Sequence, residues 1–254
     1  LIYYTIKILG GDKVMSEKTI EENIYIDGSL ALNEQEDIMK EEIKIKPKRV
    51  YRFIKRIIDI VVGLIGVIIL APITVVLYIV NIFADESKGP LFYDQLRVGK
   101  NGKYFKIYKF RTMIVGADKI LEKYLEENEE ARKEFEETQK LSNDPRITKL
   151  GKILRKTSLD EFPQFINVLK GDMSLIGPRP LVKGELDAHK GNHEIYESVK
   201  PGISGWWAAN GRSDLSYDER LKLEYYYAEN FSLWLDIKCV FKTIVSVIKK
   251  EGAK

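Results

Sequence analysis

The chain has 254 residues, of which 44% are hydrophobic and 31% are charged, so it is long and apolar enough for one or two folded domains and is not a disordered chain. Its single cysteine, Cys239, excludes a framework of intrachain disulfides. The net charge of +3 is unevenly spread, because residues 1–43 carry 4 basic and 10 acidic side chains while residues 44–111 carry 14 basic and 4 acidic ones. So strong a basic block predicts a polyanionic partner, either a membrane surface or phosphate groups.

The first segments differ sharply in composition. Residues 1–43 show no sustained hydrophobic period, and we expect a weakly ordered acidic extension there. Residues 44–56, KIKPKRVYRFIKR, hold seven basic side chains, and the next 28 residues, 57–84, are almost entirely apolar. A run of this length is enough for a transmembrane helix, and the basic flank marks its cytoplasmic end.

Pro72 lies near the middle of this apolar run and opens a second interpretation. A proline inside a helix removes one backbone hydrogen bond and kinks the helix. Each arm would then be about 12–15 residues, or about 18–22 Å long. That is shorter than the ~30 Å hydrocarbon core of a bilayer. The sequence is therefore also compatible with a re-entrant helix that breaks at Pro72 and returns to the side from which it entered.

After residue 85 the composition becomes that of a soluble domain. Two β-rich runs, residues 91–98 and 104–112, flank the turn sequence Gly-Lys-Asn-Gly and predict a β-hairpin. Alternation along the second run places Lys109 and Arg111 on one face of the strand. We expect these two cations to be available to a phosphate group.

Two further segments have helical patterns. Residues 116–140 are rich in Glu, Lys and Ala and predict a solvent-exposed helix or helix pair. In residues 216–250, apolar side chains recur at helical spacing among lysines and near Trp234: Leu233, Ile237, Phe241, Ile244 and Ile248. A basic amphipathic helix of this kind can lie in a membrane interface or pack on a core, and the pattern leaves both open.

The stretch KTSLDEFPQFINVLKGDMSLIGPRP places two adjacent carboxylates, Asp160 and Glu161, beside several apolar residues. Ser158 and Glu161 fit the S-x-x-E capping box, which alone would explain both carboxylates as the start of a helix. A catalytic interpretation also fits. Carboxylates at a helix N-terminus among cations are expected to stay ionised, which suits a nucleophile or a Mg²⁺ ligand.

Basic residues around the pair favour chemistry on phosphates. Arg155 precedes it, and Gly-Pro-Arg-Pro, ending in Pro178, Arg179 and Pro180, forms a rigid turn apt to present an arginine to a phosphate. A carboxylate nucleophile among such cations predicts phosphoryl transfer through an aspartyl-phosphate type of intermediate. A glycosidase fits poorly, because neighbouring residues on a helix do not face each other across a sugar.

Three stretches together resemble the bacterial sugar transferases, the monotopic phosphoglycosyl transferases that act on polyprenol phosphate. They are RIIDIVVGLIGVIILAPI, LRKTSLDEFPQFINVLKGDMSLIGPRP and KPGISGWWAANGRSDLSYDERLKLEYYYAENFSLWLDIKCVFKTI. The likeness covers about residues 50–254 in order and is closest to the catalytic half of the larger members that transfer galactose-1-phosphate or glucose-1-phosphate. It implies an α+β fold: a re-entrant membrane helix plus a small cytoplasmic catalytic domain with a short β-hairpin and amphipathic interfacial helices.

The resemblance also implies an activity and a set of roles. The expected reaction transfers a sugar-1-phosphate from a UDP-sugar to undecaprenyl phosphate and releases UMP, as the first membrane step of exopolysaccharide assembly. Asp160 would be the nucleophile and a Mg²⁺ ligand, and Glu161 its partner carboxylate. Pro72 would break the membrane helix. The substrate-binding residues would be Arg155, Pro178, Arg179, Pro180, Lys109 and Arg111.

These expectations divide the chain into an acidic extension (1–43), a basic flank with its membrane helix (44–84) and a catalytic domain (85–254). The expected partners are the UDP-sugar, undecaprenyl phosphate and the inner leaflet of the bacterial cytoplasmic membrane, with a homodimer as one assembly and no nucleic acid. Two alternatives stay open from the residues: a bitopic membrane scaffold without activity, and a membrane-anchored hydrolase of UDP-sugars that uses water as the acceptor.

Overall fold

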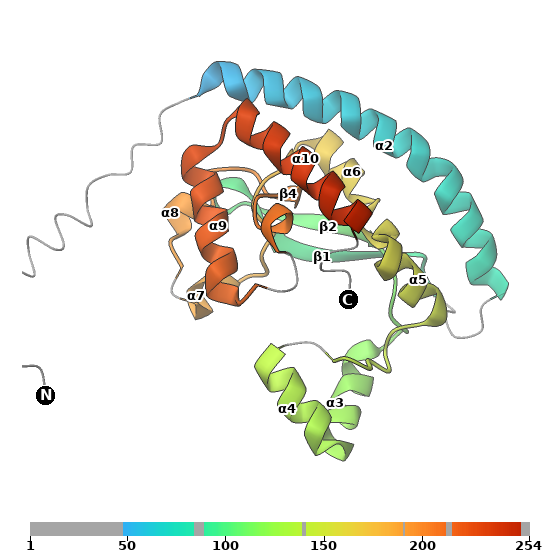
Figure 1. Ribbon diagram of the computed structural model, residues 1–254. Helices are drawn as coiled ribbons and strands as arrows, with labels where there is room; N and C mark the ends of the chain where they lie inside the picture. Colours follow the sequence, from blue (N-terminus) through green and yellow to red (C-terminus); the bar gives the residue numbers. More distant parts are fainter. Residues whose placement is uncertain (1–47, 84–88, 139–140, 190, 212–214, 250–254) are drawn as a thin grey trace, which may run out of the picture. The chain divides into compact units, whose positions relative to one another are not determined.

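The computed structural model describes residues 48–83, 89–138, 141–189, 191–211 and 215–249, and it confirms a mixed α+β fold with one long apolar helix (Figure 1). The predicted extension at residues 1–43 lies outside these ranges. The longer helices are α2 (Arg49–Phe83), α3 (Ala117–Glu127), α4 (Glu129–Thr138), α5 (Lys149–Thr157), α6 (Gln164–Lys170), α9 (Tyr217–Asn230) and α10 (Leu233–Lys249). The short helices are η2 (Lys100–Gly102), η3 (Leu159–Glu161), α7 (Glu185–Ala188), α8 (His193–Tyr196) and η4 (Ala208–Asn210).

The predicted β-hairpin is present. Strands β1 (Phe92–Val98) and β2 (Tyr104–Phe110) pair antiparallel, with Phe92 opposite Phe110 and Val98 opposite Tyr104. The turn between them contains Asn101 in the left-handed conformation (φ 56°), which asparagine tolerates better than most residues. A second, parallel pair joins β3 (Ser174–Ile176) to β4 (Gly202–Ser204).

Helix α2 corrects the expectation at Pro72. The helix continues through Pro72 without a break from Arg49 to Phe83, and it curves rather than folding back (Figure 1). Two local features favour curvature: Pro72 has no N–H for the ladder, and the hydroxyl of Thr74 donates to the carbonyl of Leu70 (2.8 Å). Among the described helices, α2 is long and apolar enough to cross a membrane by length and composition.

One side of α2 packs on the rest of the domain along most of its length. Arg56 donates to the carbonyls of Val168 and Leu169 at the end of α6, both at 2.7 Å. Asp59 is 3% exposed and accepts from the hydroxyl of Ser174 and the N–H of Leu175, both at 3.0 Å. These contacts satisfy a charge that would be costly inside an apolar helix.

A glycine allows the closest approach between α2 and α6. A methyl group at Gly66 would lie 2.4 Å from the ring of Phe165, a separation that non-bonded carbon atoms do not reach. Further along, Leu70 and Leu77 of α2 form a buried cluster with Leu91, Phe110 and Leu154. The apolar helix is therefore part of the hydrophobic core as well as a candidate membrane anchor.

Asn167 fixes the position of the hairpin relative to α6. Its side chain is completely buried; it accepts from the N–H of Tyr108 (3.1 Å) and donates to the carbonyl of Lys106 (2.7 Å). These two bonds occupy the edge of β2 that does not pair with β1. Behind them, Phe105 and Ile107 pack with Val168 and Met173 in a second buried cluster.

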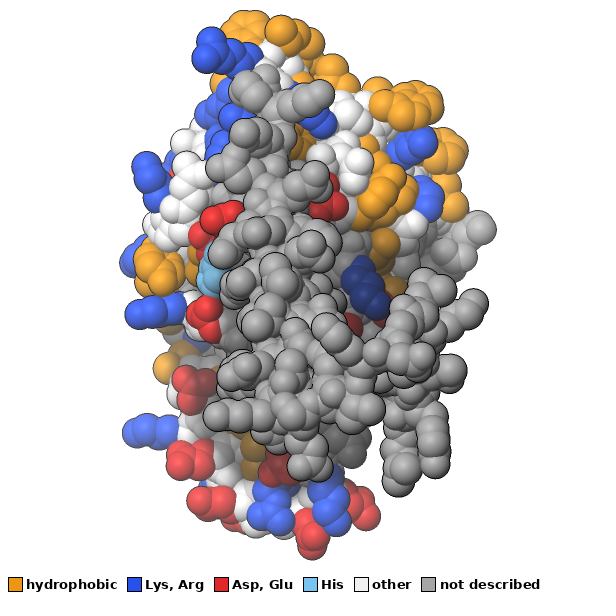
Figure 2. Space-filling view, turned by 90° about the vertical axis from the view of Figure 1, so that its left-hand side faces the viewer, with side chains coloured by type: hydrophobic (Ala, Val, Ile, Leu, Met, Phe, Trp, Pro, Cys, Tyr) orange, Lys and Arg blue, Asp and Glu red, His pale blue; other side chains and the backbone are white. Residues whose placement is uncertain are grey.

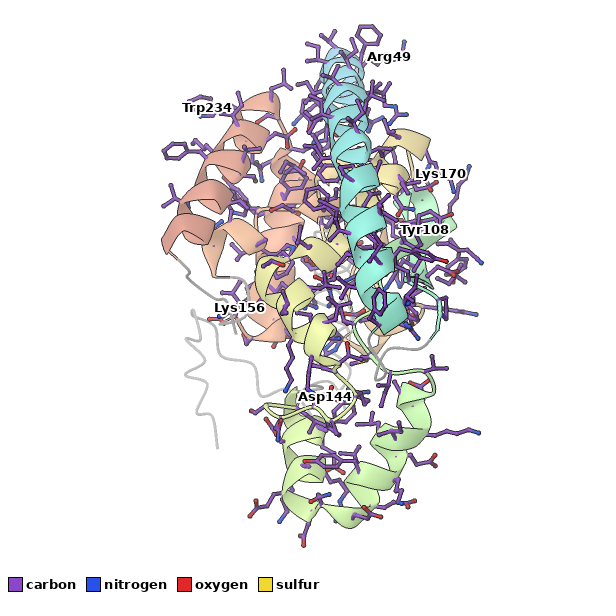
Figure 3. The ribbon with its side chains drawn as sticks, turned by 90° about the vertical axis from the view of Figure 1, so that its right-hand side faces the viewer. Arg49, Tyr108, Asp144, Lys156, Lys170 and Trp234 are labelled. Atoms are coloured by element: carbon purple, nitrogen blue, oxygen red, sulfur yellow. The ribbon has the colours of Figure 1, made fainter. Side chains whose placement is uncertain are left out.

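The solvent-exposed helix pair predicted within residues 116–140 is present as α3 and α4. Helix α10 has a buried side and an exposed apolar side: Leu235 and Cys239 are buried, whereas Trp234, Ile237 and Phe241 are exposed. Trp234 projects outward from α10 (Figure 3). In Figure 2 apolar side chains gather in the upper part of the molecule, and charges of both signs dominate the lower part, which holds α3 and α4.

Candidate functional site

The two neighbouring carboxylates lie in a short turn, not at the start of an α-helix. Ser158 adopts the left-handed conformation (φ 55°) and ends α5, and its side chain makes no capping bond. Asp160 and Glu161 follow in the 3₁₀ turn η3, before α6 begins at Gln164. The predicted capping box at Ser158 and Glu161 is therefore wrong, and both carboxylates are left for another role. The capping box that does form joins Ser216 and Glu219 at the start of α9.

Apolar residues on both sides of the pair hold the turn in place. Leu159 and Phe162 pack against the buried cluster that contains Leu70 and Leu77 of α2 and Phe110 of β2. Phe162 also meets Phe165 edge-to-face, with ring centroids 5.2 Å apart. The buried cluster to which α2 contributes thus holds the acidic turn in place.

Lys109 on β2 meets the acidic turn through an ion pair with Glu161 at 2.7 Å. Burial and the neighbouring Glu161 raise the pKa of Asp160, while Lys109 and Arg155 act in the opposite direction. Desolvation thus acts against the cations that stabilise the Asp160 charge. That this carboxylate stays ionised remains a prediction. A partly desolvated carboxylate is a more reactive nucleophile than a fully solvated one.

The other two predicted cations near the turn differ in their surroundings. The Nε of Arg155 on α5 donates to the hydroxyl of the buried Thr112 (3.0 Å), which holds the guanidinium close enough to act on the Asp160 charge. Arg111 follows the end of β2, and its Nη1 lies against Gly89, where an added methyl group would approach within 2.2 Å. Through its electrostatic effect, Arg155 is placed close to Asp160. The phosphate-binding role expected of Arg111 stays a prediction.

The predicted Gly-Pro-Arg-Pro turn follows β3 and is held by β4. A methyl group on Gly177 would lie 2.3 Å from the carbonyl of Lys200, so glycine permits this approach. Pro178 and Pro180 are buried, and Arg179 is half-buried with its Nη1 3.1 Å from Glu185. The loop thus presents one arginine on a rigid backbone, as the sequence predicts.

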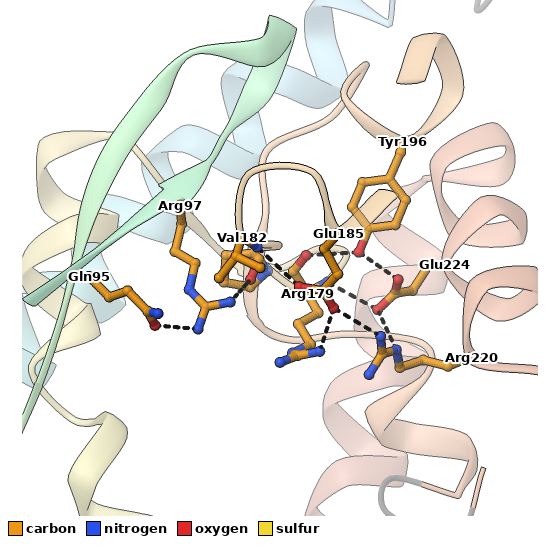
Figure 4. Close-up of polar contacts among 9 residues, drawn as sticks. Gln95, Arg97, Arg179, Val182, Glu185, Tyr196, Arg220 and Glu224 are labelled. Carbon is orange, nitrogen blue, oxygen red and sulfur yellow. Dashed lines mark hydrogen bonds and ion pairs between the residues drawn. The ribbon is translucent and has the colours of Figure 1, made fainter. Parts of the chain in front are cut away.

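Sequence reasoning missed Arg97, on β1. Its Nη1 donates to the carbonyl of Pro180 (3.1 Å) and its Nη2 to Gln95 (2.6 Å), as Figure 4 shows. Within the described residues its buried Nε has no hydrogen-bond partner. Burial and the neighbouring Arg179 lower the pKa of Arg97, whereas Glu185 and Glu161 raise it. Two guanidinium groups held close together, near Glu161, form a site that an anion would stabilise.

The donor set at the acidic turn fits Mg²⁺ in a substrate complex. In the part of the chain that the structure describes, no cluster of three or more His, Cys, Asp or Glu side chains could hold a metal by itself. Mg²⁺, however, is commonly bound through one or two carboxylates together with substrate phosphates. Asp160 and Glu161 supply that number of carboxylates.

Comparison with known proteins identifies the family. The model of the bacterial sugar transferase family matches residues 50–250, and the chain belongs to this family. It is 44% identical over 206 residues to the undecaprenyl-phosphate galactose phosphotransferase of Salmonella typhimurium, covering 81% of this chain and 43% of that protein. It is 40% identical over 199 residues to the exopolysaccharide production protein ExoY of Sinorhizobium fredii, covering 78% of this chain and 87% of that protein.

A third relative has a different sugar in its name. It is the UDP-N-acetylgalactosamine-undecaprenyl-phosphate N-acetylgalactosaminephosphotransferase of Aeromonas hydrophila, 39% identical over 214 residues, covering 82% of this chain and 47% of that protein. The chain therefore spans less than half of the length of the Salmonella and Aeromonas proteins and most of the length of ExoY.

Proposed function

We propose that this protein is a membrane-bound phosphoglycosyl transferase that transfers a sugar-1-phosphate, galactose or glucose, from a UDP-sugar to undecaprenyl phosphate and releases UMP. The observation that carries the proposal is the acidic turn itself. It holds a half-buried carboxylate, Asp160, beside Glu161, Lys109 and Arg155, and α2 anchors it from behind. The names of the related proteins support the same class of donor and acceptor.

The proposed reaction has two displacements at one phosphorus atom. A carboxylate oxygen of Asp160 attacks the β-phosphorus of the UDP-sugar, the bond from that phosphorus to the bridging oxygen breaks, and UMP leaves. The phosphate oxygen of undecaprenyl phosphate then attacks the same phosphorus and displaces the Asp160 carboxylate. The products are UMP and a lipid diphosphate-sugar, so one phosphoanhydride bond is lost and one is formed.

The basic side chains of the site neutralise the negative charge of the donor diphosphate. Lys109 holds Glu161 beside the nucleophile, and Arg155 lies near Asp160. Arg97 and Arg179 form the proposed grip on the diphosphate, with the flanking Pro178 and Pro180 fixing the backbone. Asp160, helped by Glu161, would hold Mg²⁺, which when bound supplies positive charge to the donor phosphates.

A panel of UDP-sugars, incubated with undecaprenyl phosphate and Mg²⁺, tests the proposal through UMP release. One hexose donor should give many turnovers with the lipid present and only about one UMP per enzyme molecule without it. EDTA should stop turnover and added Mg²⁺ should restore it. Many turnovers without lipid would instead support the UDP-sugar hydrolase. If UMP is released with none of the donors, the remaining interpretation is a membrane scaffold without activity.

The packing of α2 supports a monotopic arrangement with both ends on the cytoplasmic side. Near its beginning, Lys48 donates to the carbonyl of Phe231 (2.6 Å) and Lys55 pairs with Asp236 (2.8 Å). Near its end, Leu77 packs in the cluster with Leu91, and Asn81 donates to the carbonyl of Gly89 (3.2 Å). A single polar domain that contacts both ends cannot lie on both sides of a bilayer.

Labelling with a membrane-impermeant maleimide should show this topology. Cysteines introduced at the exposed Arg49 and Lys103 should both stay unlabelled in intact cells and both react in inverted membrane vesicles. The unmodified chain is the matched control, since its Cys239 is fully buried. Reaction of the Lys103 site alone in intact cells would establish a spanning helix and contradict the monotopic arrangement.

A further inference from the structure

Glu224 lies under the proposed donor-binding loop, in the interior of the molecule. It belongs to α9 and is 1% exposed. Its Oε1 accepts from the N–H of Arg179 at 3.2 Å, and its Oε2 lies 2.5 Å from the hydroxyl of Tyr196. That hydroxyl is in turn 2.8 Å from the carbonyl oxygen of Arg179 (Figure 4). Glu224 and Tyr196 thus hold both backbone polar groups of Arg179.

The number of hydrogens available for these contacts determines which protonation state of Glu224 fits them. The hydroxyl of Tyr196 has one proton but lies within hydrogen-bond distance of two oxygens, on Arg179 and on Glu224. If Glu224 is ionised, one of these buried oxygen pairs has no hydrogen between its atoms. If Glu224 is protonated on Oε2, it donates to Tyr196, and Tyr196 donates to Arg179. The protonated form satisfies every contact.

The charged groups around Glu224 do not reverse the preference for its protonated form. Arg220 on α9 lies 4.0 Å from Oε1, and Arg179 is adjacent, but both guanidinium groups also reach Glu185, at 3.4 Å and 3.1 Å. The phenols of Tyr196, Tyr217 and Tyr225 complete the titratable surroundings. Burial raises the pKa of Glu224 to about 7 although Tyr196, Arg220 and Arg179 act to lower it.

We propose that Glu224 is a positioning residue for the donor site, and that it acts as a neutral carboxylic acid which fixes the Arg179 backbone directly and through Tyr196. The inference rests on the proposed role of Arg179 in binding the donor diphosphate. Loss of the Glu224 proton would put a buried charge under the loop, with the Arg220 guanidinium no closer than 4.0 Å, and would leave one contact without a hydrogen. Donor binding then weakens as the pH rises through the pKa of Glu224.

The decisive variant is Glu224→Gln, which has the shape of the neutral acid, one acceptor oxygen for Arg179 and one donor group for Tyr196. The donor KM of the unmodified protein should rise between pH 6 and pH 8.5, and the same rise should be absent or much smaller in Glu224→Gln. Tyr196→Phe keeps the ring in the core and removes the hydroxyl that links Glu224 to the carbonyl of Arg179. Its donor KM should be about five- to tenfold higher at every pH, with a smaller change in kcat.

A stability measurement separates this inference from the proposed function. A carboxyl whose pKa is raised on folding stabilises the protein below its unfolded pKa, and this contribution is lost as the pH rises through the folded pKa. The unfolding midpoint of the unmodified protein should therefore fall from pH 5 to pH 8 relative to that of Glu224→Gln, whether or not the protein transfers a sugar. Parallel stability profiles, or an equal KM rise in both proteins, would overturn the inference. If Glu224→Gln does not fold, a pH-independent donor KM in the unmodified protein overturns it.

Discussion

Asp160→Asn should reduce the transferase activity by at least about 10⁴-fold, because an amide is a very poor nucleophile toward phosphorus. In the proposed reaction Asp160 forms the covalent bond, and Leu159 and Phe162 anchor the turn that carries it. UMP release measures the loss. The mass spectrum of the intact protein, taken after UDP-sugar is added without lipid, should show a sugar-phosphate adduct on the unmodified protein alone.

A matched control for this change is Asp94→Asn. Asp94 is an exposed carboxylate on the hairpin that pairs with Lys106 at 2.9 Å, and its loss should leave both UMP release and the adduct unchanged. Persistence of the adduct in Asp160→Asn would assign the nucleophile to another residue, with Glu161 the first to examine.

Arg97→Ala should lower kcat/KM for the donor by about 10²–10³-fold, because it removes one of the two guanidinium groups proposed to bind the diphosphate, and with it about two charge-assisted hydrogen bonds. Arg97→Lys should recover only part of this loss, since lysine keeps the charge but not the planar fork. The measurements are donor kinetics and the rise in unfolding midpoint that the UDP-sugar produces.

Lys106→Ala is the control on the same hairpin, because its ion pair with Asp94 is exposed to solvent and should matter little. Unchanged donor kinetics in a stable Arg97→Ala protein would contradict the proposed grip. The diphosphate would then have to bind nearer to Lys109 and Arg155.

Local patterns predicted the elements that depend on neighbouring residues. The hairpin follows from alternation and from a turn that contains Asn101, and α3 and α4 follow from their composition. The same reasoning failed where distant contacts decide the outcome. Ser158 and Glu161 have the spacing of a capping box, but α5 ends with Ser158 in the left-handed conformation, and Glu161 pairs with Lys109, 52 residues away in sequence.

The break predicted at Pro72 failed for a related reason. A proline removes one bond from the ladder, but contacts with α6 and the hairpin hold the helix on both sides of it, at Gly66 and at Leu77. The sequence pattern also predicted Asp160, Glu161 and Arg179 as site residues, but gave no reason to add Arg97 or Glu224. Those two residues meet the Arg179 loop from segments 83 and 45 residues away, and only the fold shows these contacts.

The packing of α2 has a practical consequence for preparing the enzyme. Leu70 and Leu77 belong to the same buried cluster as Leu91, Phe110 and Leu154, and Arg56 and Asp59 bind the backbone of α6 and β3. A shortened protein designed for aqueous solubility by deleting this helix would expose that cluster and free the turn that carries Asp160. Helix α2 and the rest of the domain therefore have to be produced and crystallised as one unit.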